Sequence, residues 1–128
     1  MEGNRKGVYG ISHEENYTNG QIIFKEDSPG EWLYIVLTGS VETSRSVEGR
    51  KITIERLQPG DLFGEMEFIG RMKRTVTAQA VGATTLGIVD RDSIVKEYNQ
   101  LSKQFKSILE TIPARLKKMI DRACDASS

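Results

Sequence analysis

The 128-residue sequence contains one cysteine, Cys124, and one histidine, His13. A lone cysteine cannot form an internal disulfide, and one histidine with one cysteine is too few for a His/Cys metal site. The same shortage excludes a cupin-type metalloenzyme, and no serine or cysteine nucleophile can be paired with a histidine base. We therefore predict that the chain is not an enzyme and holds no metal or cofactor.

The sequence also lacks an excess of either charge and any long apolar run. Eighteen Lys and Arg residues balance eighteen Asp and Glu residues, so the formal net charge is zero. No basic field favours nucleic acid, and no apolar run approaches the roughly 20 residues of a spanning helix. The N-terminus lacks the apolar region of a signal peptide. These features predict a single cytoplasmic domain that binds neither membrane nor, by this chain alone, nucleic acid.

Short apolar runs separated by turn residues fill the middle of the chain. They read QIIF, WLYIVLT, SVETSRSV, KITIERL, RTVTAQAV and ATTLGIVD, with Gly39 and Gly82 interrupting two pairs of them. Strands at this short spacing favour an all-β sandwich, barrel or jelly roll over βαβ units. We predict a loose polar segment at 1–16, a β-domain at 17–90, and C-terminal helices at 91–125 within the same domain.

The pattern changes to helix after residue 90. RDSIVKEYNQ predicts one helix with Asp92 or Ser93 as its N-cap, and a longer helix follows from Leu101 to Ala123. We expect Pro113 to kink or break the longer helix, because proline lacks the backbone N–H. Steps of three and four predict an apolar stripe that either packs on the β-domain or forms a dimer seam, which we favour. Its members are Leu101, Phe105, Ile108, Ile112, Leu116, Met119 and Ala123.

The stretch FGEMEFIGRMKRTV, residues 63–76, combines groups that suit an anionic, sugar-containing ligand. Gly64 allows close backbone approach, and the next six residues predict one helical turn whose first amides can bind an anion. Arg74 offers a planar fork for phosphate oxygens, with the Thr75 hydroxyl beside it. Glu65 can accept a hydrogen bond from a ribose hydroxyl. The alternative is a structural Glu65–Arg74 ion pair with glycines that serve only turns.

Longer segments carry a family resemblance. The frame IIFKEDSPGEWLYIVLTGSVE, then ITIERLQPGDLFGEMEFIG, then RTVTAQA resembles the cyclic nucleotide-binding domain family over about residues 17–123. That family includes regulatory subunits of cAMP-dependent protein kinase and bacterial catabolite activator proteins. Gly30, Gly39, Gly60 and Gly64 match its turn glycines. The resemblance implies a mainly β fold, an eight-stranded β-roll of jelly-roll type followed by C-terminal α-helices.

The resemblance also implies roles for individual residues. Residues 63–76 would form the phosphate-binding cassette, with Glu65 on the ribose 2′-hydroxyl and Arg74 on the cyclic phosphate. The C-terminal helices, from Asp92 onward, would cap the base and transmit binding. The implied binding residues are Gly64, Glu65, Met66 and Glu67 (the last two through their amides), Arg74, Thr75, and Ile54 and Leu57 as an apolar wall beside the base.

Three positions in the cassette depart from the family's pattern. Glu67 replaces the usual Ala, Ser or Gly, Val76 replaces Ala, and Lys73 replaces Pro. A carboxylate beside a phosphate is costly if it is desolvated and harmless if it faces water. Glu67 therefore either faces solvent or marks a pocket that has closed.

Three hypotheses about function follow. The first is a regulatory module that binds cAMP more readily than cGMP and moves its C-terminal helices. It would signal to an unknown effector protein and form a homodimer through those helices. The second is a non-binding form of the same fold that is used for protein interaction. The third is the sensory half of a transcription regulator that lacks its DNA-binding domain. No helix-turn-helix follows the helices in this sequence, so we expect no DNA binding by this chain alone.

Overall fold

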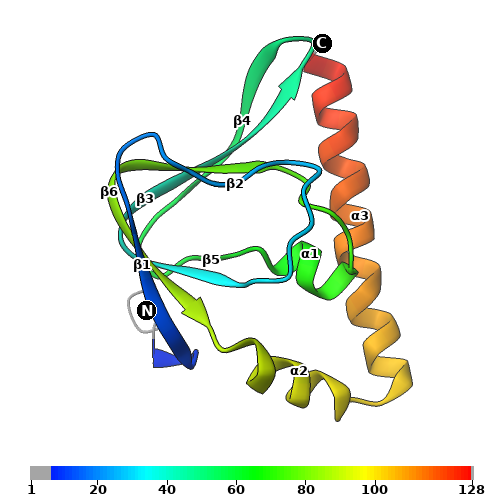
Figure 1. Cartoon of the computed structure of the whole chain (residues 1–128). Helices are drawn as coiled ribbons and strands as arrows, with labels where there is room; N and C mark the ends of the chain where they lie inside the picture. The colour runs from blue at the N-terminus through cyan, green and yellow to red at the C-terminus, as the bar shows by residue number, and fades with distance from the viewer. Residues whose placement is uncertain (1–6, 128) are drawn as a thin grey trace.

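The computed structural model describes residues 7–127. It shows a curved antiparallel sheet rolled around its own core, with a long helix along one side and a short helix between them (Figure 1). The elements, in chain order, are β1 (Ile11–Tyr17), β2 (Ile22–Phe24), β3 (Tyr34–Val47), β4 (Arg50–Leu57), β5 (Leu62–Phe63), α1 (Glu65–Gly70), β6 (Thr77–Val89), α2 (Arg91–Asn99) and α3 (Lys103–Ser127). The sheet order is β1-β6-β3-β4, while β2 pairs with β6 and β5 pairs with β3. This confirms the predicted fold class.

Two long strands explain why the described residues form six strands rather than eight. β3 has 14 residues and β6 has 13, and each continues through the glycine that we expected to interrupt it. Thr38 pairs with Thr85 and Ser40 with Val81, so the register shifts between these pairs. Gly39 and Gly82 adopt φ values of 84° and 72°. The glycines therefore form a bulge between paired strands, which bends the ladder without ending it.

The expected loose N-terminal segment is wrong for residues 11–16. Ile11–Tyr17 form β1, which pairs antiparallel with β6. The run ISHEENY has no apolar alternation, so backbone pairing with β6 and the half-buried Ile11 and Tyr17, the latter packed against the core, hold it in place. The part of the prediction that concerns residues 1–6 lies outside the described residues.

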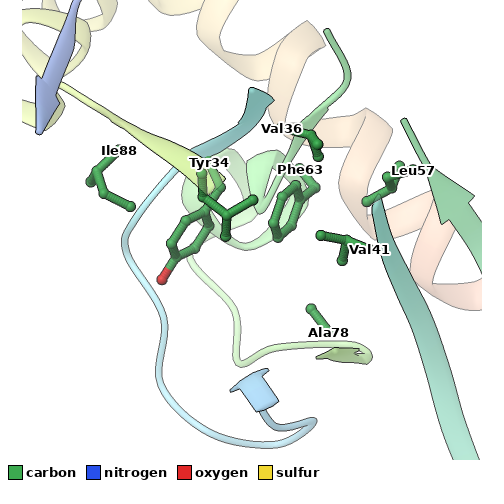
Figure 2. Close-up of a cluster of buried hydrophobic side chains, with 8 residues drawn as sticks. Tyr34, Val36, Val41, Leu57, Phe63, Ala78 and Ile88 are labelled. Atoms are coloured by element: carbon green, nitrogen blue, oxygen red, sulfur yellow. The ribbon is translucent and has the colours of Figure 1, made fainter. Parts of the chain in front are cut away.

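The core lies inside the roll and ends beneath the cassette. Tyr34, Val36 and Val41 of β3 point into it with Leu57, Phe63, Ala78 and Ile88 (Figure 2). The Tyr34 and Phe63 rings stack with centroids 5.1 Å apart, and Phe24 packs against both. Burying each large apolar side chain contributes about 1.5–3 kcal/mol. The aromatic cluster of Phe24, Tyr34 and Phe63 therefore packs directly beneath the cassette, residues 63–76.

The helices correct two predictions. α2 begins at Arg91 with Asp90 as its N-cap, two or three residues before the caps we expected. α3 runs unbroken through Pro113, so the expected break is wrong. Pro113 is buried, and a Cβ built on Gly70 of α1 would lie 3.1 Å from the Pro113 Cβ. Packing against α1 therefore offsets the lost hydrogen bond at this turn.

The apolar stripe of α3 does not pack on the roll. The buried residues of α3 are Pro113 and Cys124, with Ile120 half-buried between them. The exposed apolar side chains beside them, at 40–61% exposure, are Phe105, Ile108, Ile112, Leu116 and Met119. Packing of the stripe on the β-domain is thus wrong, and the dimer seam stays a prediction. No helix within residues 7–127 combines the length and apolar composition needed to cross a membrane.

Candidate functional site

The cassette, residues 63–76, leaves the sheet at β5 and returns to it before β6. Gly64 turns the chain with φ 91°, and a Cβ there would lie 2.7 Å from the Trp32 carbonyl oxygen. α1 then occupies Glu65–Gly70, as the sequence predicted, and ends at Arg71 in the left-handed region. Figure 1 shows α1 between the roll and α3. The cassette is therefore in contact with both parts of the molecule.

Arg74 is buried, with only 2% of its side chain exposed. Its guanidinium carbon lies 4.1 Å from the centre of the Phe24 ring, and Nη2 donates to the Trp32 carbonyl at 3.0 Å. Its backbone N–H donates to the Ser28 carbonyl at 2.9 Å. Cation–π contact and carbonyl oxygens compensate part of the lost hydration of this charge. The guanidinium is thus held in a fixed orientation.

Glu67 neither faces water nor leaves the cassette open. Its side chain is 4% exposed, and Oε1 lies 2.8 Å from Nη1 of Arg74. Its other oxygen, Oε2, accepts from the Thr75 hydroxyl at 3.0 Å and from the Thr75 amide at 3.4 Å. We call the Arg74 guanidinium with the Thr75 hydroxyl and amide the anion cradle. The cradle holds a carboxylate of its own chain.

Glu65 lies at the start of α1 and does not pair with Arg74, so the alternative of a structural Glu65–Arg74 pair finds no support in these contacts. Burial raises the pKa of its carboxyl, and the nearby Glu67 and Glu55 carboxylates raise it further. Hydrogen bonds from the backbone amides of Glu65 and Met66 act in the opposite direction. The Met66 amide, which we expected to face a phosphate, donates instead to Glu65.

A small cavity of about 60 Å³ adjoins the cradle. Of the predicted binding residues, Ile54, Gly64, Glu65, Met66, Glu67 and Thr75 line it. Leu57 lies in the hydrophobic core and is not among the lining residues, and Arg74 lies behind Glu67. Val76 and Ile120 of α3 complete the wall. The structure thus gathers most of the predicted residues at one place, in a space smaller than a nucleotide.

A larger cavity of about 480 Å³ lies on the other side of α1, between the cassette, the 29–31 loop and α2. Its basic residues are Arg71 and Lys73 of the cassette and Arg91 of α2. Phe68, Met72, Val95 and Tyr98 contribute apolar surface. Glu67 lines both cavities and so separates them.

Sequence reasoning missed several groups that build the cradle. The Trp32 carbonyl and the Phe24 ring hold Arg74, and Gly30 leaves space for it. Arg45 of β3 donates from Nε to the Thr75 carbonyl at 2.7 Å and from Nη1 to Asp121 of α3. A backbone carbonyl carries no sequence signal, and Arg45 is one of many charged residues on the strands. Neither could be found without the fold.

A sequence model described as the cyclic nucleotide-binding domain matches residues 14–100. The chain belongs to the cyclic nucleotide-binding domain family. The Cyclic AMP receptor protein of Thermus thermophilus is 31% identical over 108 residues, which cover 84% of this chain and 48% of that protein. The CRP-like cAMP-activated global transcriptional regulator of Mycobacterium tuberculosis is 26% identical over 114 residues, covering 86% of this chain and 50% of that protein. The chain thus spans about half the length of these curated relatives.

Solved structures of other proteins share the fold of this chain. The cAMP-bound form of the EAL enzyme Bd1971 matches with a TM-score of 0.79 and 26% identity, over 88% of this chain and 30% of that one. The catabolite activator protein of Thermus thermophilus matches with a TM-score of 0.65 and 28% identity, over 89% of this chain and 54% of that one.

Proposed function

We propose that this chain is a regulatory module that binds a cyclic nucleotide, cAMP in preference to cGMP, and signals by moving α2 and α3. The observation that carries the proposal is the anion cradle. Arg74 and Thr75 direct three donors at one buried point, and that point already holds an anionic group. Donors of this kind, in a water-poor site, are what recognition of a phosphate requires.

The other predicted groups suit the rest of such a ligand. The cyclic phosphate would lie on Arg74 and Thr75, and the Glu65 carboxylate would accept a ribose hydroxyl. Ile54, Val76 and Ile120 offer apolar surface to the base. Among the described residues that line the cavity, none distinguishes adenine from guanine, because Thr75 suits both. The preference for cAMP therefore rests on relatives whose names refer to cAMP, including the cAMP-dependent protein kinase regulatory subunit of Dictyostelium discoideum.

Two contacts connect the cradle to α3. Arg45 bridges the Thr75 carbonyl and Asp121, and Ile120 lines the cavity in which the ligand would lie. A ligand that occupies this cavity changes the surroundings of both α3 residues. Only a difference in affinity for two helix placements can shift their populations. The contact between ligand and Ile120 would supply that difference.

Calorimetric titration tests the proposal. Wild-type protein should bind cAMP saturably at one site, and cGMP more weakly. Thr75→Val removes a donor without changing side-chain size and should weaken binding by about tenfold, the effect of roughly 1.4 kcal/mol. Glu14→Gln on β1, an exposed residue remote from the cassette, is the control and should bind as wild type does. No saturable binding up to millimolar ligand, or unchanged binding by Thr75→Val, would contradict the proposal.

A second candidate function is protein interaction without a ligand. It is favoured by the occupation of the cradle by Glu67 and by the small size of the adjoining cavity. This hypothesis predicts that wild-type protein binds neither nucleotide. The exposed stripe of α3 would then be its main functional surface, as a seam for a second copy or for an effector. The sensory half of a transcription regulator remains a further proposal, supported by the transcriptional regulator of Mycobacterium tuberculosis.

A further inference from the structure

Glu67 makes the contacts that the proposed function assigns to a phosphate. One oxygen pairs with Arg74 Nη1 at 2.8 Å, and the other accepts both donors of Thr75 at 3.0 and 3.4 Å. Arg74 Nη1 and both donors of Thr75 are used, while Arg74 Nε has no hydrogen-bond partner within residues 7–127, and both charged side chains are at least 96% buried. The partners of a surface ion pair readily exchange their contact for water molecules, but both partners of this pair are buried. A phosphate cannot enter the cradle while the carboxylate stays there.

Resting on the proposed function, we propose that Glu67 is a built-in competitor of the nucleotide phosphate with two positions. In the free protein its carboxylate occupies the cradle, as the structure shows. In the liganded protein it turns into the larger cavity between α1 and α2. The residue thus sets the affinity of the site and reports its occupation to α2.

The larger cavity offers a suitable destination for the displaced carboxylate. Arg71, Lys73 and Arg91 line it against one other carboxylate, that of Glu31. Arg91 lies 3.7 Å from Glu31, and within residues 7–127 its Nε has no hydrogen-bond partner. Since Glu67 already lines this cavity, rotation of its side chain is enough for the change. A displaced Glu67 therefore gains cationic neighbours rather than remaining a buried, unpaired charge.

The second position involves the helix that carries Arg91. α2 also carries Tyr98, which lines the same cavity and donates its hydroxyl to Glu110 of α3. A carboxylate that pairs with Arg91 only in the liganded state adds an attraction between the cassette and α2 in that state alone. Such a state-dependent contact is what couples a binding site to a moving element.

The competition lowers the apparent affinity for the nucleotide. Only molecules whose cradle is open can bind, so the apparent dissociation constant equals the intrinsic one divided by the open fraction. Removing the Glu67 carboxylate abolishes the form in which that carboxylate occupies the cradle. We expect Glu67→Gln and Glu67→Ala to bind cAMP at least tenfold more tightly than wild type. Glu14→Gln removes one carboxylate from an exposed strand position and should leave the affinity unchanged.

A double-mutant cycle tests the second position. Arg91→Gln should weaken cAMP binding in the wild-type background, because the displaced carboxylate loses a cation. In the Glu67→Gln background the same change should have no effect on affinity. Equal effects of Arg91→Gln in both backgrounds would overturn the proposed destination.

Thermal unfolding with inorganic phosphate separates failure of the competitor from failure of the proposed function. Phosphate should raise the melting temperature of Glu67→Gln and Glu67→Ala more than that of wild type. If no protein binds a cyclic nucleotide but phosphate still stabilises only the Glu67 variants, the competitor stands and the proposed function falls. If wild type and the folded Glu67 variants bind cAMP with the same measurable affinity, or if neither cAMP nor phosphate affects the variants, the competitor is overturned.

Discussion

Gly30 determines whether Arg74 can occupy its buried place. A Cβ built on Gly30 would lie 1.9 Å from Nε of Arg74 and 2.4 Å from its Cζ. These atoms belong to the middle of the side chain, which Phe24, Trp32 and Glu67 hold from other sides. Movement of the terminal Arg74 nitrogens alone would not relieve this overlap. Position 30 is therefore restricted by space and not by the geometry of a turn.

Gly30→Ala should displace the Arg74 guanidinium and so damage both stability and the anion cradle. Overpacking of this kind costs about 1–3 kcal/mol. We expect a lower free energy of unfolding in urea and a loss of cAMP binding in calorimetry. Gly10→Ala is the matched control, since nothing lies within 4 Å of a Cβ at that position. Equal stability of the two variants would show that Arg74 is not confined as described.

Glu65 should make the free protein less stable as the pH rises. Burial raises its pKa in the folded state above the ordinary value of 4.5, while the unfolded state keeps that value. Between the two values the folded state binds more protons, so stability falls as pH rises through this window and stays reduced above it. Glu65→Gln removes this titrating carboxyl, so the free energy of unfolding should depend less on pH in this window. Urea unfolding of both proteins between pH 4 and 8 tests the point, and parallel curves would contradict it.

The same residues show what the sequence could and could not reveal. Arg74 and Thr75 could be proposed as anion-binding residues from residue type and spacing together with the family resemblance, because their spacing alone also fits a structural ion pair. The place of Glu67 could not be found, because either a solvent-facing or an inward-facing rotamer fits its position in α1. Its burial depends on Thr75 and Arg74 meeting α1 in space, which is a property of the fold.

Among the elements, α3 is tied to the cassette by few polar contacts. Arg45 is 14% exposed and pairs with Asp121, which is 39% exposed and also lies 3.0 Å from Lys117. The contact with Arg45, and then that with Lys117, lowers the pKa of the Asp121 carboxyl. Arg45 also reaches the Thr75 carbonyl. The polar contact between the C-terminal half of α3 and the cradle therefore runs through the Arg45 side chain.

Asp121→Asn should loosen α3 without unfolding the roll. Because the pair is partly exposed, we expect the free energy of unfolding to change by less than about 1 kcal/mol. Amide hydrogen exchange should accelerate in the last turns of α3 and hardly change in β3 and β6. Lys118→Ala, at an exposed position of the same helix, serves as the control. Unchanged exchange in α3 after Asp121→Asn would exclude this link.

Strands and helices were predictable in kind but not in extent. The apolar runs around Gly39 and Gly82 read as separate strands, because glycine usually ends such runs. Pairing with neighbours on both sides carries β3 and β6 through these positions. Pro113 similarly suggested a break in α3, yet packing against Gly70 keeps the helix continuous. In each case tertiary contact overrides a local signal that is correct in isolation.

At the scale of the whole molecule, the exposed apolar stripe of α3 is a surface that a second protein chain could bury. Five large apolar side chains on one helix face are exposed to solvent in the single chain. Their spacing suits a second α3 packed along the same face, so we propose a homodimer. The structure rules out the roll of the same chain as the cover for this face. A symmetric partner satisfies both copies at once.

Ile112→Glu should convert the dimer into a monomer. Ile112 is 52% exposed near the middle of the stripe, and a charge there would be buried in the seam. Light scattering after gel filtration should give twice the chain mass of 14.3 kDa for wild type and the chain mass for the variant. Ala114→Glu, on the other side of the helix, should remain dimeric. A monomeric wild type at high micromolar concentration would contradict the proposal.

The most direct test of the whole account is a crystal structure of the chain grown with cAMP. We expect the cyclic phosphate on Arg74 and Thr75 and a ribose hydroxyl on Glu65. The Glu67 carboxylate should be turned toward Arg71, Lys73 and Arg91. We also expect α2 and α3 to differ in position from those in the free protein. A structure at saturating cAMP that keeps Glu67 on Arg74, with no nucleotide at the cassette, would contradict the account.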